Sequence, residues 1–220
     1  MTLSGSYSAS AFFAAVALAP PGPVTVTGGY TVTEGIDVTR PSLRINGATV
    51  HGTVEFGSSA TGSSITNSNA VGFNIFGADN VLIQGNTFDG QGNNPSNEIW
   101  DNPSGNTPDG WVIRNNTFRN FYKDGSHSEA IFVGYSTNGL IEGNTFTNNG
   151  NTSHIFFSWF GNRADPATSY PRDMCVRGNT FNETHGAYYD VNFRAEIPAH
   201  ANIRIQRNAT NTNPEFYGDC

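Results

Sequence analysis

Four polar segments carry most of the side chains that could do chemistry: residues 94–103, 120–132, 150–166 and 184–196. Together they hold acids, histidines, cations and aromatic rings. Elimination at a uronic acid needs a base to take a proton and a cation to neutralise the sugar carboxylate. Hydrolysis of a glycosidic bond instead needs two carboxylic acids at a set separation. The segments supply side chains for both reactions.

The candidate residues divide by chemical role. Those that could act as acid, base or charge neutraliser are Lys123, His127, Glu129, His154, Arg163 and Arg194. Those that could hold a sugar by ring stacking or hydrogen bonds are Trp100, Trp159, Tyr189 and Asp190. The candidate carboxylates for hydrolysis are Glu98, Glu129 and Asp190. Each residue also has a structural interpretation, because a histidine or aspartate beside a turn often supports the backbone by a hydrogen bond.

A repeated phrase must position these segments. NVLIQGNTF at 80–88 recurs at 110–118, 138–146 and 173–181, with a decayed copy at 202–210, at intervals of 28 to 35 residues. Such a repeat indicates a solenoid. Residues within the phrase alternate with period two, which predicts a strand with one buried face. The four polar segments should then stack on one side of the solenoid.

Aligned copies of the phrase put like residues into columns. The predicted inward columns are Ile83, Ile113, Ile141, Val176 and Ile205; Asn86, Asn116, Asn144, Asn179 and Asn208; Phe88, Phe118, Phe146 and Phe181; and Val81, Trp111, Met174 and Ile203, with Gly139 as a gap. Parallel strands stack about 4.8 Å apart, so each side chain should touch its own copy. We expect hydrogen bonds along the asparagines and stacking of the phenylalanines. On the outer face, Glu142 should lie between Arg114 and Arg177.

The repeat length accommodates three short strands and their loops. We therefore expect an all-β fold, a single-stranded right-handed parallel β-helix of about six to seven coils over residues 23–210. A solenoid needs covered ends. Residues 8–19 predict a helix that caps the first coil within residues 1–22, and 211–220 should form a tail that packs on the β-helix. The other interpretation of 8–19, a secretory signal peptide, lacks a charged leader.

These features resemble a known superfamily. A short Ala-rich helix, then PPGPVTVTGGYTVTEGI at 20–36, then coils that end in GNTF, resemble the pectin-lyase-like right-handed parallel β-helices. The resemblance covers most of the chain and implies that fold. It implies no single activity, because the superfamily includes pectate and alginate lyases, glycoside hydrolases, epimerases, phage tailspikes and structural proteins.

Composition excludes several classes of partner. The 220 residues form one domain, with a net charge of −7 and one lysine, which argues against nucleic acid. No apolar run reaches about 18 residues, so we expect no membrane span. We expect no cofactor and no dedicated metal site; Ca²⁺ near Asp109 and Asp124 is the one alternative, and no motif supports it.

An apolar stripe should face outward beside the inward columns. It consists of Leu82, Val112, Leu140 and Cys175. Such a stripe is normally covered, here by the C-terminal tail or by a second copy that makes a homo-oligomer. Cys220 ends the tail about two coils away. Cys175 and Cys220 either form a disulfide, which would favour an extracellular setting, or are two unrelated thiols.

Two classes of function fit these observations. One is a polysaccharide-binding or polysaccharide-cleaving β-helix, a lyase or a hydrolase, that acts through its loop-rich face. The other is a non-catalytic structural or adhesive component of a virion. The expected location is extracellular for the first and the virion surface for the second.

Overall fold

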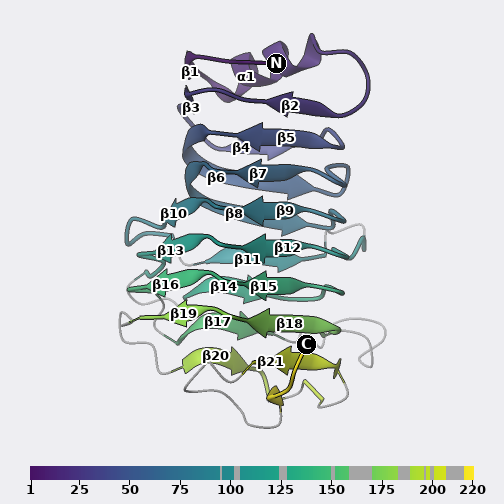
Figure 1. The fold of residues 1–220 in the computed structure, drawn as a ribbon, viewed down its shortest axis with the longest axis vertical. Helices are drawn as coiled ribbons and strands as arrows, with labels where there is room; N and C mark the ends of the chain where they lie inside the picture. The colour runs from purple at the N-terminus through teal and green to yellow at the C-terminus, as the bar shows by residue number, and fades with distance from the viewer. Residues whose placement is uncertain are drawn as a thin grey trace.

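The computed structural model is a solenoid of parallel strands, stacked along one axis (Figure 1). The structure describes residues 1–94, 96–101, 105–123, 128–149, 152–158, 170–182, 189–195, 197–198, 201–206 and 216–220. The expected all-β parallel fold is confirmed. The right-handed sense, the number of coils and the boundaries after residues 22 and 210 stay predictions.

Two sheets form the walls of the solenoid. The first contains eight strands: β2 (Val24–Val26), β5 (Leu43–Asn46), β7 (Ser64–Thr66), β9 (Leu82–Gln84), β12 (Val112–Arg114), β15 (Leu140–Glu142), β18 (Met174–Arg177) and β21 (Ile203–Ile205). Consecutive members pair in parallel, and Ile65, Ile83, Ile113, Ile141, Val176 and Ile205 share one buried column. The repeated phrase therefore stacks as the sequence predicts.

The second sheet has two rows joined by two long strands, β6 (Ala48–Gly57) and β8 (Asn69–Phe76). The corner row comprises β10 (Thr87–Asp89), β13 (Thr117–Arg119), β16 (Thr145–Thr147) and β19 (Thr180–Phe181). The wall row comprises β4 (Ile36–Val38), β11 (Asn97–Trp100), β14 (Glu129–Val133), β17 (Ser153–Phe157) and β20 (Tyr189–Phe193). At the N-terminal end, β1 (Gly5–Tyr7) and β3 (Tyr30–Val32) complete this sheet.

The predicted asparagine column forms a buried ladder between the first sheet and the corner row. The Nδ2 of Asn86 donates to Asn116 Oδ1 at 3.0 Å and to the carbonyl of Ile65 at 3.0 Å, and its backbone N–H donates to Asn116 Oδ1 at 2.9 Å. The same three bonds recur at Asn116 and Asn144. These bonds satisfy buried backbone groups at each bend. Asn208 lies outside the described residues.

The predicted phenylalanine column stacks inside the solenoid. Ring centroids are 5.3 Å apart between Phe88 and Phe118, 5.1 Å between Phe118 and Phe146, and 5.2 Å between Phe146 and Phe181, with interplanar angles of 18°, 12° and 11°. The first three rings are fully buried. Near-parallel rings at this spacing follow directly from the strand spacing.

The gap at Gly139 accommodates the indole of Trp111. Trp111 is fully buried, and a Cβ on Gly139 would overlap its six-membered ring. We expect Gly139→Ala to lower the free energy of unfolding by about 1–3 kcal/mol through overpacking. Chemical denaturation of a double-mutant cycle with Trp111→Val checks this, because the smaller side chain should remove most of the cost. An equal cost in both backgrounds would contradict the proposed clash.

On the outer face of the first sheet, Glu142 lies in register with both Arg114 and Arg177, as predicted. It forms an ion pair with Arg177 at 2.8 Å. The Nε of Arg114 instead donates to Gln84 Oε1 at 2.8 Å. The ladder therefore pairs each arginine with the preceding strand.

A short helix covers the first coil. Helix α1 (Ala9–Ala17) lies at the N-terminal end of the stack (Figure 1), slightly shorter than the predicted 8–19. The Ser8 hydroxyl caps it, and Phe12 is buried against Tyr30 with ring centroids 5.9 Å apart. Arg40 donates to the carbonyls of Val16, Pro20 and Gly22 and so satisfies the helix end.

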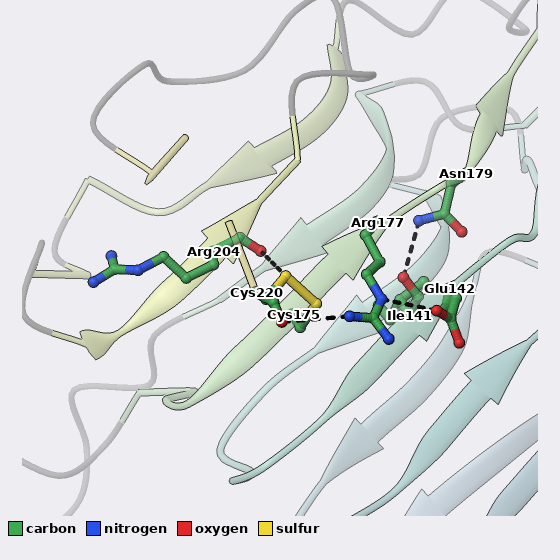
Figure 2. The surroundings of a disulfide bond; sticks show 7 residues. All are labelled: Ile141, Glu142, Cys175, Arg177, Asn179, Arg204 and Cys220. Atoms are coloured by element: carbon green, nitrogen blue, oxygen red, sulfur yellow. Dashed lines mark hydrogen bonds and ion pairs between the residues drawn. A yellow bond between two sulfur atoms is a disulfide. The ribbon is translucent and has the colours of Figure 1, made fainter. Parts of the chain in front are cut away.

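A disulfide joins the other end of the solenoid to its tail. Cys175 and Cys220 are bonded, with Cα atoms 5.8 Å apart, and Figure 2 shows the bond beside Arg177 and Arg204. Arg177 donates to the Cys220 carbonyl at 3.3 Å. The tail is thus held at the Cys175 end of the apolar stripe. Leu82, Val112 and Leu140 are half-buried, and a subunit contact through them stays a prediction.

Candidate functional site

The outer face of the wall row combines carboxylates with aromatic rings. One outward column reads Asp37, Glu55, Asn74, Glu98, Phe132, Phe156 and Asn192 on successive strands. The next outward column begins with Gly57, Phe76 and Trp100. Strand alternation turns these side chains outward because their neighbours Ile75, Ile99, Val133 and Phe157 fill the core.

Two half-buried glutamates on this face have raised pKa values. Partial burial and the negative charge of Asp37 raise the pKa of Glu55, against a hydrogen bond from Asn74 that lowers it. Partial burial and the charge of Glu55 raise the pKa of Glu98. Asn74 lies between the two glutamates: it is hydrogen-bonded to the Glu55 side chain, and its Oδ1 accepts from the Glu98 backbone N–H at 3.0 Å. A carboxyl group whose pKa is raised toward neutrality is suited to general acid catalysis.

Four aromatic rings continue across the same face. Ring centroids lie 6.3 Å apart between Phe76 and Trp100, 6.2 Å between Trp100 and Phe132, and 5.8 Å between Phe132 and Phe156. The first three are half-buried, whereas Phe156 is 6% exposed. The row crosses β8, β11, β14 and β17, roughly 14 Å along the stack at the strand spacing. The three half-buried rings, which span about 10 Å of this row, offer apolar platforms to a bound sugar chain.

Glu129 lies inside the solenoid instead of on this face. It is 1% exposed and lies in register with the buried Ser153, whereas Tyr189, the next residue in that register, is 44% exposed. Burial raises the pKa of Glu129 to about 8. This raised pKa favours the protonated, neutral carboxyl, and its buried position does not let it contact a polysaccharide on the outer face.

His154 is also buried, and its hydrogen bonds and ring contacts indicate a structural role. Its Nε2 lies 3.0 Å from the carbonyl of Asn182, which requires Nε2 to carry the hydrogen, and its Nδ1 lies 3.5 Å from Asn149 Nδ2. The imidazole packs against Phe146 and Phe181, each with centroids 5.6 Å away. Burial lowers the pKa of His154 to about 4, against the effects of the Asn182 carbonyl and Asp190. A neutral, enclosed imidazole supports the backbone.

The remaining predicted residues that the structure describes lie near the ends of the wall strands. Lys123 is exposed in the connection that enters β14, whereas Arg194 is exposed just after β20. Tyr189 and Asp190 lie at the start of β20. Lys123, Tyr189 and Asp190 therefore lie toward the start of the wall strands, whereas Arg194 lies beyond their other end, about 15 Å away along a strand. Convergence of the predicted residues on one face stays a prediction. His127, Trp159 and Arg163 lie outside the described residues.

Of the predicted residues, Trp100 and Glu98 lie on the outer face described above. Sequence reasoning missed Glu55, Phe76, Phe132 and Phe156. The signal was present, because the period-two pattern that places Ile131 and Val133 inward also turns Phe132 outward.

In the described part of the chain, no group of three or more histidine, cysteine, aspartate or glutamate residues is arranged to hold a metal ion. None of the described helices is long and apolar enough to span a membrane.

The fold and this face define a class of protein, a parallel β-solenoid with an acidic and aromatic outer wall. A search of solved structures finds similarity to an alginate lyase from Paenibacillus sp. str. FPU-7, with a TM-score of 0.50 and 15% sequence identity. The match covers 94% of this chain and 76% of the lyase. At this identity the similarity shows a common fold. No protein-family model and no curated protein matches the chain.

Proposed function

We propose that this protein binds and cleaves a polysaccharide laid along the outer face of the wall row. The observation that carries the proposal is the stacked register of two half-buried glutamates and a row of aromatic rings. Aromatic rings can stack on sugar faces, and a carboxyl group with a raised pKa is better suited than an ordinary one to donate a proton as a general acid. The fold shared with an alginate lyase supports the same class of substrate.

The glutamates support hydrolysis as the reaction. Glu55 and Glu98 are two strands apart in register, so their backbones are about 10 Å apart. This is close to the carboxyl separation of about 6.5–9.5 Å that leaves room for an attacking water in inverting glycosidases. Glu98, beside Trp100, would be the acid and Glu55 the base. An elimination route would instead use Lys123 or Arg194.

The disulfide fits an extracellular setting, because such bonds persist in oxidising compartments. No described feature favours the alternative of a structural virion component. We therefore propose that the protein binds its polysaccharide outside the cell.

A panel of acidic and neutral polysaccharides tests the proposal. We expect new reducing ends with one of them, whereas absorbance near 235 nm would identify elimination. Glu98→Gln should slow cleavage by about 10²-fold or more while binding persists, and Trp100→Ala should weaken binding about tenfold, or about 1.4 kcal/mol.

Glu142→Gln is the matched control, because Glu142 lies on the first sheet and pairs with Arg177. It should leave both cleavage and binding unchanged. If no polysaccharide is bound or cleaved, or if Glu98→Gln retains the full rate, the proposal is wrong.

A further inference from the structure

A second polar surface feature lies on the corner row, away from the aromatic rings. It is a hollow of about 600 Å³ where β6 and β8 pass β10 and β13. Its polar lining includes Thr49, His51, Asn69, Asp89, Gln91 and Arg119. Small-molecule sites commonly have volumes of about 300–1,000 Å³. Size and polarity therefore both allow a ligand here.

A bulge in β6 presents His51 at this hollow. The pairing of β6 with β8 shifts register between Val50 and Thr53, so that two residues, His51 and Gly52, lie opposite the single residue Val71. At the bulge the backbones of Gly52 and Gly35 lie so close together that a Cβ on Gly52 would overlap Gly35. Bulges of this kind redirect side chains, often beside binding sites. The His51 ring is exposed, and no hydrogen bond joins it to a described residue.

An ordered set of hydrogen bonds positions the opposite wall. Asp89 Oδ2 accepts from Arg119 Nε at 2.9 Å, and its Oδ1 accepts from the Gln91 backbone N–H at 2.9 Å and from Asn120 Nδ2 at 3.0 Å. Partial burial opposes the ionised form, but these bonds hold the pKa of Asp89 below its usual value. Gln91 is kept at a φ of 59°, a conformation that few residues other than glycine adopt.

The charges of this wall cancel while donor groups stay available. Asp89 neutralises Arg119, so the pair presents no net charge to the hollow. Only the Nε of Arg119 is used in this pair, and the Arg119 side chain is 52% exposed. The terminal guanidinium nitrogens, the amides of Gln91 and Asn69 and the hydroxyl of Thr49 can therefore contact a ligand. This mixture of donors and acceptors suits the hydroxyl groups of a sugar better than an ion.

We propose that this hollow is a second saccharide-binding site, which anchors the polysaccharide away from the aromatic row. The inference rests on the proposed function, because the anchored chain is the one that the wall row cleaves. Asp89 is a positioning residue that orients Arg119 and Gln91. Arg119, His51 and Gln91 contact the sugar.

Calorimetric titration of the full chain tests the anchor, with cellohexaose, mannohexaose and a mannuronate hexamer as probes. We expect the double variant His51→Ala/Arg119→Gln to weaken binding of the probe that the parent prefers by about tenfold. Asp89→Asn should weaken it several-fold, and Thr31→Ala, on the same sheet outside the hollow, should leave it unchanged. Cleavage of a trisaccharide too short to reach both sites should keep the parent rate in all three variants.

Two further outcomes separate this inference from the proposed function. Parent-like affinity in the double variant, with binding still weakened in Trp100→Ala, would overturn the anchor and leave the proposed function standing. Binding that depends on His51 and Arg119, without cleavage of any polysaccharide, would support the anchor and contradict the proposed cleavage. A thermal melt of each variant shows that the fold is retained.

Discussion

Removing the Cys175–Cys220 disulfide is expected to lower the free energy of unfolding by about 4 kcal/mol. The bond joins residues 45 positions apart, and a closed loop of that length restricts the unfolded chain by about this amount. Denaturant unfolding of a Cys175→Ser/Cys220→Ser variant, beside the oxidised parent, measures the difference. The parent kept in dithiothreitol is the control and should match the variant. If the oxidised parent and the variant unfold at the same denaturant concentration, the bond contributes nothing.

The disulfide also holds the last layer of the core in place. Phe216 stacks on Phe193 with centroids 4.0 Å apart, and Phe193 stacks on Phe157 at 5.0 Å. Gly218 donates its N–H to the carbonyl of Ile205, at the edge of the first sheet. A tail released by reduction would uncover this stack. We therefore expect the variant to bind more of a hydrophobic dye at the same protein concentration.

Replacing Glu129 with glutamine is expected to stabilise the protein by about 3–5 kcal/mol at pH 8 and to have little effect below pH 4.5. The ordinary pKa of this carboxyl is 4.5, and burial raises it to about 8 in the folded state. Between these values the unfolded chain loses a proton that the folded chain keeps. Each pH unit therefore removes about 1.4 kcal/mol of stability from the parent. Glutamine does not titrate, so the variant should escape this loss.

Urea unfolding from pH 4 to pH 9 measures this dependence. Glu142→Gln is the matched control, because Glu142 is about one-third exposed and paired with Arg177. His154 should act in the opposite direction: its pKa falls from 6.5 to about 4 on folding, so the parent loses stability as pH falls through that range. From these two groups alone, stability should be greatest between about pH 4.5 and 6.5. A difference between parent and Glu129→Gln that stays constant with pH would contradict the buried neutral carboxyl.

Much of the fold could be predicted because the repeat carries the same information several times. Asn86, Asn116, Asn144 and Asn179 recur at one position of the phrase, and only stacked strands bring them into hydrogen-bonding contact. The phenylalanine column and the gap at Gly139 follow from the same alignment. Helix α1 was predictable from its apolar spacing and from Pro20 and Pro21 beyond its end.

The candidate site was less predictable. Lys123 precedes the wall strand β14, whereas Arg194 follows the wall strand β20, so the two lie at opposite ends of the wall strands although both belong to the predicted polar segments. The sequence predicted His154 and Glu129 as catalytic residues, because histidine and glutamate are common in active sites. Their burial depends on which residues pack around them, and the spacing of polar residues does not report this.

By itself, the sequence determined the strands, their inward faces and their stacking order. The period-two alternation sets which side chains are buried, and the repeat length places equivalent residues of successive copies side by side. Only the tertiary structure decided whether Cys175 and Cys220 bond, which arginine Glu142 pairs with, and where the bulge at His51 falls. It also decided that Glu55, Glu98 and the aromatic rings share one outer wall. These features depend on where each strand begins and ends and on contacts between distant segments, which the period-two pattern alone does not specify.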